Sequence, residues 1–274
     1  MMSPKLIRFA DLEPSWAVKR ATEPGYLRWL VSWMGGPPGY INFNPGIAAE
    51  CGWGAAGLMV MPQGNRQAGL HTHGVTEIYL ILKGEVESFD HTGVPHRAGP
   101  MDCLYIPAGV PHGVRTVGTE DVHLAWVHDA PERTGVSVYR DEAQPGDSDQ
   151  PVQIVRLHDQ APQWTQPGAR QGGTMRWQIG YVGSGPGEIA NTRVRLGVTF
   201  IPSGNRDVVP ACDEDRLFVC VSDRIVARCD LWTEALSTLD AVHVPAGAPV
   251  TFWNPGDGVA TLLWLEQRGN AERP

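Results

Sequence analysis

The sequence predicts an all-β fold made of two similar halves, and three observations support this prediction. Gly and Pro number 32 and 23 among the 274 residues, and they interrupt short apolar runs. No segment has the long 3.6-residue period of a dominant helix, whereas turn signals at intervals of roughly 8–12 residues are typical of sandwiches and barrels. The third observation is an internal repeat, so the same architecture is expected twice.

The repeat extends over most of the chain. Residues 5–39 align without a gap with residues 153–187 at a shift of 148, and Trp16 matches Trp164. Later blocks align at shifts of 140 and 138, and the drop from 148 to 140 gives the N-terminal copy eight additional residues after Gly39. Rare tryptophans that match in register argue against coincidence and for a tandem duplication.

The two copies are expected to form separate domains. A polar stretch that contains Pro and Gly, RDEAQPGDSDQP at residues 140–151, lies where they join. We therefore predict an N-terminal domain over residues 1–148 and a C-terminal domain over residues 149–274. Because the linker is short, a packed pair fits better than two loosely connected modules.

The first copy shows its strands through β-branched and aromatic content. We expect strands at GLMVMP (57–62), EIYLILKG (77–84), EVESFD (85–90), DCLYIP (102–107) and DVHLAWVH (121–128). Gly84 supplies the positive φ of a hairpin turn. Both faces of the 77–84 strand are apolar, which predicts that the sister domain or another subunit covers the outer face; a short exposed strand is the alternative.

Composition and charge limit the partners and the compartment. The formal net charge is −8 and there is no run of Lys or Arg, which argues against nucleic acid and acidic membrane surfaces. The five cysteines form no CxxC pair, so a reduced, cytoplasmic thiol set is expected. No secretory signal and no membrane-spanning run are evident. The expected partner is a small-molecule substrate, and the chain is expected to form a homodimer or a higher homo-oligomer.

The segment GLHTHGVTEIYLILKG, residues 69–84, combines two histidines with a glutamate. His71 and His73 alternate along an extended segment, so their imidazoles point to one side, roughly 6.6 Å apart along it. Glu77 opens the next strand, and His112 begins another strand after a Pro-Gly break. Imidazole with carboxylate suits iron, manganese, zinc, nickel or cobalt rather than calcium or copper(I).

These residues make the sequence resemble the cupin superfamily. The pattern His71-x-His73-x3-Glu77-x6-Gly84 fits its first motif, and Pro107-x-Gly109-xx-His112 fits its second. The sequence departs from the pattern in three places. Gly64 lies one residue too far from His71, Gly99 lies two residues too far from Pro107, and Thr116 replaces the usual Asn. Because the repeat extends the likeness to both halves, the chain resembles a bicupin. The alternative is a polar cluster at a strand end.

The resemblance implies two jelly-roll domains with a divalent metal inside the first. The implied ligands are His71, His73, Glu77 and His112, and water or substrate would fill the remaining positions. Iron(II) is the first choice of metal, with manganese, nickel or zinc as alternatives.

The second copy lacks the equivalent ligands. His112 aligns with Val250, and the other three ligands fall near Pro210, Cys212 and Arg216. We predict a degenerate cupin domain without metal ligands that supports, dimerises or walls off the first domain. Two alternatives remain open: a metal site that uses Cys212 with Asp213, and a small-anion pocket that uses Arg216.

Three further residues are candidates for proton transfer in the first copy. Tyr79 and Tyr105 lie on strands that carry or precede the ligands, although buried core tyrosines would look the same. His123 is a candidate acid or base on the closing strand. It faces opposite to Trp126 and His128, so only one of these two sets can line a pocket.

Three kinds of function are compatible with this pattern. The first is a dioxygenase that acts on a small aromatic or keto or hydroxy acid, because the Glu77 ligand resembles quercetin-type and acireductone-type dioxygenases. The second is a redox-neutral isomerase, lyase or decarboxylase in which the cation acts as a Lewis acid. The third is a ligand-binding or sensor protein. The additional region between Gly39 and Gly57 is expected to act as a lid or as a domain contact.

Overall fold

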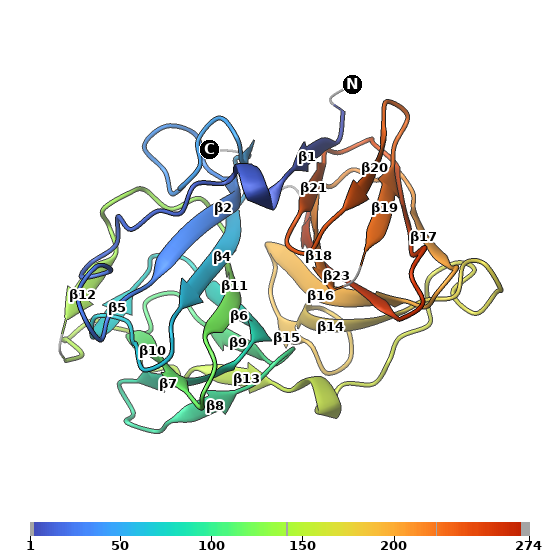
Figure 1. Ribbon diagram of the computed structural model, residues 1–274. Coiled ribbons are helices and arrows are strands. Elements are labelled where there is room, and N and C mark those ends of the chain that lie inside the picture. The colour runs from blue at the N-terminus through green and yellow to red at the C-terminus, as the bar shows by residue number, and fades with distance from the viewer. Residues whose placement is uncertain (1–2, 141, 223, 270–274) are drawn as a thin grey trace. The chain divides into compact units, whose positions relative to one another are not determined.

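The computed structural model describes residues 3–140, 142–222 and 224–269 (Figure 1). Over these residues it consists of β-strands, turns and two short 3-10 helices, η1 (Phe9–Asp11) and η2 (Leu157–Asp159), without an α-helix. The all-β prediction is therefore confirmed. Within these ranges there is also no helix with the length and apolar character that a bilayer crossing requires.

The N-terminal unit comprises residues 12–159 and contains two sheets. The order in the seven-stranded sheet is β13 (Gln153–Val155), β9 (Cys103–Ile106), β6 (Glu77–Lys83), β11 (Val122–His128), β4 (Ala55–Met61), β2 (Trp29–Gly35) and β3 (Ala49–Glu50). The order in the five-stranded sheet is β12 (Val138–Arg140), β5 (Leu70–Thr72), β10 (His112–Val117), β7 (Glu85–Asp90) and β8 (His96–Ala98).

The C-terminal unit comprises residues 3–11 and 160–269 and repeats this plan. The order in its seven-stranded sheet is β1 (Lys5–Ile7), β21 (Ala241–Val244), β18 (Arg216–Ser222), β23 (Ala260–Gln267), β16 (Val194–Ile201), β14 (Trp177–Gly183) and β15 (Ile189–Ala190). The order in its four-stranded sheet is β17 (Arg206–Val209), β22 (Val250–Trp253), β19 (Ile225–Arg228) and β20 (Thr233–Leu236).

The strand that opens each copy joins the unit formed by the other copy. β1 pairs with β21 of the C-terminal unit, and β13 pairs with β9 of the N-terminal unit. The predicted boundaries, 1–148 and 149–274, therefore differ from the observed units. The repeat alignment shows that β1 and β13 are equivalent, but equivalence in sequence does not say which sheet edge each strand joins.

An arginine–aspartate pair anchors both exchanged segments. Arg8 lies 2.9 Å from Asp240, and the equivalent Arg156 lies 3.3 Å from Asp102. The same aspartates accept backbone N–H bonds from Phe9 at 2.8 Å and from Leu157 at 3.1 Å. Each aspartate thus satisfies an arginine and the backbone at the start of a 3-10 turn, which holds the exchanged strand on its sheet.

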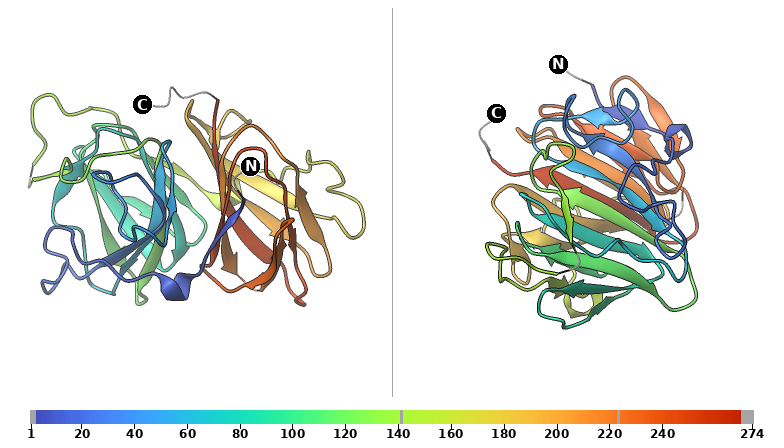
Figure 2. Two further views of the ribbon diagram at one scale, coloured as in Figure 1. Left: turned by 90° about the horizontal axis from the view of Figure 1, so that it is seen from above. Right: turned by 90° about the vertical axis from the view of Figure 1, so that its left-hand side faces the viewer.

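The core of the N-terminal unit lies between its two sheets, which face each other (Figure 2). It brings together side chains of the seven-stranded sheet, such as Met59 and Tyr79, and of the five-stranded sheet, such as Val86 and Val114. Ile78 and Leu80 on the opposite face of β6 are also buried. Side chains on both faces of this strand are thus buried, whereas cover by the sister domain or by another subunit stays a prediction.

A glycine–tryptophan contact recurs in both units. A Cβ atom on Gly197 would lie 2.4 Å from the carbonyl oxygen of Ile179 and 2.3 Å from the indole of Trp264. At the equivalent Gly57, it would lie 1.9 Å from the carbonyl oxygen of Val31 and 2.7 Å from the indole of Trp126. Only glycine leaves room for a neighbouring strand and an indole at this position.

We expect Gly197→Ala to lower the free energy of unfolding by about 1–3 kcal/mol, because the added methyl group forces backbone and indole apart. The measurement is urea denaturation followed by tryptophan fluorescence. Gly172→Ala is the matched control, since an added Cβ there meets nothing within 4 Å. Equal unfolding midpoints for the two variants would contradict the steric explanation.

Candidate metal centre

Three histidines converge on one carboxylate in the N-terminal unit. The Oε2 atom of Glu77 lies 2.8 Å from Nε2 of His112, 3.2 Å from Nε2 of His73 and 3.8 Å from Nε2 of His71. The backbone explains the convergence, because His71 on β5 pairs directly with His112 on β10. Glu77 begins β6, and its side chain points into the same space.

The four residues satisfy the requirements of a divalent transition metal. One ligand atom from each lies within 4.8 Å of all the others, and all four side chains are buried. A cation bound at about 2.1 Å holds its ligand atoms roughly 3–4 Å apart. Nε2 of His73, which faces the Glu77 carboxylate, has no aligned hydrogen-bond partner although it is buried. An unsatisfied buried nitrogen beside an anionic carboxylate fits a bound cation.

The protonation of these ligands reflects burial and mutual charge. Burial lowers the pKa of His71 to about 3, so this imidazole is neutral. Burial also lowers the pKa of His73, but the charges of Glu77 and Glu132 more than offset it and raise this pKa to about 10. Burial raises the pKa of Glu77, yet His73 and hydrogen bonds from His112 and His128 hold it well below its usual range. The centre therefore has a carboxylate ligand in its charged form.

Neighbouring groups orient the imidazoles. Nδ1 of His112 lies 2.9 Å from the carbonyl oxygen of Val110, so it donates its proton there and turns Nε2 toward Glu77. Nδ1 of His73 lies 2.6 Å from Oε2 of Glu132, and the other carboxylate oxygen accepts the N–H of Gly74 at 2.9 Å. Such partners fix the tautomer and the ring orientation of metal-binding histidines.

Glu132 and His128 also belong to this site, although neither was predicted as a site residue. Nε2 of His128 lies 3.4 Å from Oε1 of Glu77, and together with His73 and Glu132 it forms a second group that could hold a cation. In the sequence, His128 lies two residues after Trp126 and therefore on the same face of the closing strand, which could have indicated it. Glu132 follows that strand in a loop, outside any motif, so no signal indicated it.

A small cavity of about 80 Å³ opens beside the metal ligands. Its volume is well below the roughly 300–1,000 Å³ of pockets that take drug-sized ligands, so it fits a small substrate. Besides His71, His73, Glu77 and His128, it is lined by Val18, Arg28, Leu30, Ile41, Phe43, Met59, Gln67, Tyr79, Trp126, Ser137 and Tyr139. Ile41 and Phe43 belong to the additional region between Gly39 and Gly57, which thus contributes to the cavity wall.

The structure brings one of the three candidate proton-transfer residues to this cavity. Tyr79 lines it, whereas Tyr105 and His123 do not. Tyr105 alternates with Leu104 and Ile106, which fill the core between the sheets, so its side chain lies on the opposite face of β9. His123 alternates in the same way with the core residue Leu124, so its side chain lies on the opposite face of β11. Burial lowers the pKa of His123. On β11, Trp126 and His128 line the cavity instead.

The equivalent region of the C-terminal unit carries a different charge pattern. Arg216 pairs with Glu266 across neighbouring strands, and the equivalent pair in the N-terminal unit is Glu77 with His128. An arginine therefore occupies the position of the carboxylate ligand. Its Nη1 and Nη2 donate to the carbonyl oxygens of Pro210 and Ala248 at 2.9 and 3.0 Å. A guanidinium in this position opposes cation binding. Cys212, Glu214 and Glu266 nevertheless form a half-buried group of possible ligands.

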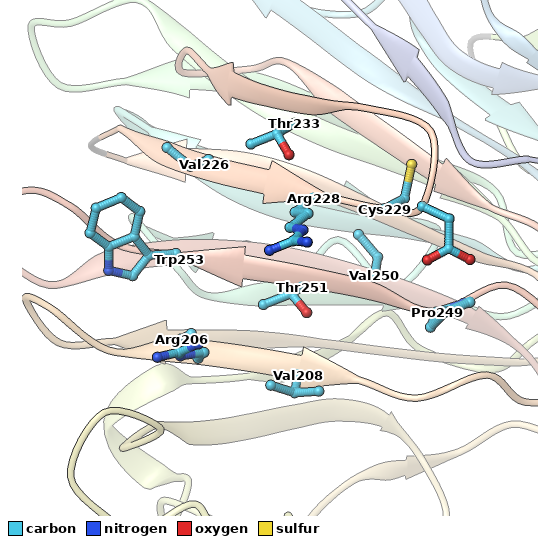
Figure 3. Close-up of a pocket in the computed structure, with 11 residues that line it drawn as sticks. Arg206, Val208, Val226, Arg228, Cys229, Thr233, Pro249, Val250, Thr251 and Trp253 are labelled. Atoms are coloured by element: carbon cyan, nitrogen blue, oxygen red, sulfur yellow. The ribbon is translucent and has the colours of Figure 1, made fainter.

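A hollow of about 590 Å³ lies elsewhere, on the sheet β17-β22-β19-β20 (Figure 3). Arg206, Arg228 and Trp253 extend from three neighbouring strands along this face. Trp253 is 44% exposed. Apart from Cys229 and Asp230, the lining of this hollow has no residue of a metal-binding type, so the hollow differs in kind from the N-terminal cavity.

Comparison with known proteins agrees with this description of the N-terminal unit. Residues 57–128 match the cupin domain family (Cupin_2). Over 62 residues, the chain is 42% identical to dimethylsulfoniopropionate lyase DddQ of Ruegeria pomeroyi. This stretch is 23% of the present chain and 30% of the lyase, so the chain matches less than a third of that relative's length.

Two solved structures extend the likeness to both units. Oxalate decarboxylase of Lactobacillus farciminis, in a formate complex, has a TM-score of 0.66 at 12% identity and matches over 98% of this chain and 87% of its own. Salicylate 1,2-dioxygenase of Pseudoaminobacter salicylatoxidans, in adducts with gentisate, has a TM-score of 0.64 at 15% identity, over 96% and 80%. The shared feature is the fold, two tandem jelly rolls.

We expect the protein to bind one transition-metal ion per chain and Glu77→Gln to weaken this binding by at least about 100-fold, because it removes the anionic ligand. Elemental analysis and competition with a chelating dye give stoichiometry and affinity. Glu214→Gln in the C-terminal unit is the control and should leave both unchanged. A loss of metal in Glu214→Gln alone would assign the ion to the other unit.

Proposed function

Because residues 57–128 match the cupin domain family and the chain shares its fold with a tandem structure, we propose that its N-terminal unit is a metal-dependent enzyme of redox-neutral chemistry. In this proposal, it moves a proton on a small organic substrate, as a lyase or isomerase does. The observation that carries the proposal is a buried phenol, Tyr79, that lines the same cavity as the metal ligands.

The hydroxyl of Tyr79 has a defined partner. Gln67 accepts the N–H of Val114 through Oε1 at 2.9 Å, which fixes the orientation of its amide. Its Nε2 therefore donates to Oη of Tyr79 at 3.3 Å. Oη thus accepts a hydrogen bond from Gln67, while burial and the charge of Glu77 raise the pKa of Tyr79, so the phenol keeps its proton. A protonated phenol held in this way suits donation of a proton to a substrate carbon.

The remaining lining supports the same chemistry. A divalent ion bound by His71, His73, Glu77 and His112 would supply Lewis-acid polarisation of a substrate carbonyl or carboxylate. Apolar side chains such as Leu30, Phe43 and Trp126 limit water in the cavity, which strengthens the electrostatic interactions of the polar groups that share it. Tyr79 would then exchange its proton with the substrate rather than with solvent.

The sequence match with a lyase supports this choice among the three kinds of function. Over the aligned 62 residues the identity is substantial, at 42%, although they cover less than a third of the lyase. The lyase's own substrate is not part of the proposal.

A dioxygenase, the first expectation from the sequence, is the second candidate here, because a set of imidazoles with one carboxylate also suits iron(II). The likeness to salicylate 1,2-dioxygenase supports this candidate through the fold alone. The two candidates differ in a simple requirement, since only the dioxygenase needs molecular oxygen.

The test of the proposed function uses protein loaded with zinc and kept under argon. Incubation with a panel of small organic acids, followed by proton NMR in deuterated water, should reveal deuterium exchange, elimination or isomerisation of at least one of them. The apo-protein is the control. Turnover that requires both iron and oxygen would refute redox-neutral chemistry in favour of the dioxygenase, and retention of a panel compound without turnover would favour a binding protein.

We expect Tyr79→Phe to lower kcat about 10²–10⁴-fold, because it removes the group that exchanges the proton. Metal content should stay at the wild-type value. Tyr105→Phe makes the same chemical change on the face of β9 that points away from the cavity, and it should alter kcat by less than about twofold. Equal losses in both variants would contradict the assignment of the proton to Tyr79.

A further inference from the structure

The duplication provides an internal comparison of one buried arginine in two settings. Nη1 and Nη2 of Arg28 donate to the carbonyl oxygens of Tyr26 and Lys19 at 3.1 and 2.8 Å. Nη1 and Nη2 of Arg176 donate to the carbonyl oxygens of Thr174 and Pro167, which are the equivalent residues at the shift of 148, at 3.0 and 3.3 Å. The exposed fractions of Arg28 and Arg176 are only 1% and 2%. The two guanidinium groups are therefore held in the same way.

The two arginines differ in their counter-ion. Nε of Arg176 lies against Oδ1 of Asp207 in an ion pair, although without hydrogen-bond alignment. At the shift of 140 for this block, Asp207 is equivalent to Gln67. The N-terminal unit thus has a neutral amide at the position of the carboxylate. Among the residues that the structure describes, no Asp or Glu forms an ion pair with Arg28.

An unpaired buried guanidinium is costly, so its retention calls for an anion. Of the five N–H donors of a guanidinium, the two backbone carbonyls use only two. The hydroxyl of Tyr139 is another neighbour: burial raises the pKa of Tyr139, and the guanidinium of Arg28 opposes this increase. A tyrosine hydroxyl is neutral and cannot balance the charge. A positive charge without a carboxylate partner among the described residues therefore borders the cavity.

The position of Arg28 relates it to the metal ligands. Arg28, Gln67 and Tyr139 all line the cavity of about 80 Å³ that also borders His71 and Glu77. The ring of Tyr139 stacks on that of His71 with centroids 4.9 Å apart. A small molecule in this cavity would therefore reach both the guanidinium and the metal ligands.

We propose that Arg28 binds the carboxylate of the substrate, and that the exchange of Asp207 for Gln67 between the two copies frees this arginine for that purpose. The proposal rests on the proposed function, because it places a small organic acid in the cavity of the metal centre. A carboxylate is favoured because a guanidinium matches its planar pair of oxygens. The cavity volume limits the substrate to an acid with few carbon atoms. Arg28 then determines specificity for anionic over neutral substrates.

The test measures binding rather than turnover. Acetate is titrated into zinc-loaded protein and followed by calorimetry, with acetamide as the neutral isostere. Wild-type protein should bind acetate at least about tenfold more tightly than acetamide. Arg28→Gln and Gln67→Asp should each weaken acetate binding at least about tenfold, since one removes the cation and the other introduces a carboxylate like the one that neutralises Arg176. Asp207→Asn in the C-terminal unit is the control and should leave acetate binding unchanged.

The double variant Arg28→Gln/Gln67→Asp separates a shared contact from a general charge effect. If the carboxylate introduced at position 67 acts by pairing with Arg28, the double variant should bind acetate no more weakly than Arg28→Gln alone. Because Arg28 also holds two backbone carbonyls, each variant is first checked for its zinc content. If Arg28→Gln fails to fold, Gln67→Asp decides the question.

Two results would overturn the proposal: wild-type protein that does not distinguish acetate from acetamide, and Gln67→Asp that binds acetate as tightly as wild type. Neither result depends on turnover. Failure of the redox-neutral function under argon would leave the acetate measurements standing, and failure of the acetate measurements would leave the argon result standing.

Discussion

The arrangement of the N-terminal unit depends on one constraint, the burial of the Glu77 carboxylate between two sheets. A buried carboxylate is strongly unfavourable unless cations or hydrogen-bond donors surround it. Here, four imidazoles direct Nε2 toward it, from three strands and one loop. The pairing of His71 with His112 and of His128 with Glu77 makes this possible, because the strand register brings the rings together. The metal-ligand geometry follows from the way the fold compensates this charge.

The C-terminal unit shows that the same backbone tolerates the opposite solution. Arg216 replaces Glu77, and Glu266 replaces His128, so the charges at both positions change together. Asp207 replaces Gln67 and pairs with Arg176. In the C-terminal copy the buried arginine thus has a counter-ion within the chain, whereas the carboxylate ligand is gone. The N-terminal copy keeps a charged, incompletely compensated interior, which is the condition under which an ion and an anionic ligand would bind favourably.

Local sequence patterns predicted the strands and the convergence of His71, His73, Glu77 and His112, because alternation along strands and short turns determine where these side chains point. The exchange of β1 and β13 was not predictable in this way, since both strands have equivalent sequences and equivalent sheet edges. Glu132 and Tyr139 escaped detection for a related reason. They follow the closing strand in segments without a repeat partner, and only the tertiary fold brings them to His73 and His71.

The segments outside the repeat also explain why the two units differ in more than their ligands. Ile41 and Phe43 come from the region that is eight residues longer in the N-terminal copy, and Ser137 and Tyr139 come from the segment after the last aligned block. All four line the cavity beside the metal ligands. A wall of this kind reduces the water around a charged centre, and lower local polarity strengthens each interaction of Arg28 and Glu77 with a bound ligand. The duplication thus supplied a common scaffold, and the additional segments supply the enclosure that the chemistry of one copy requires.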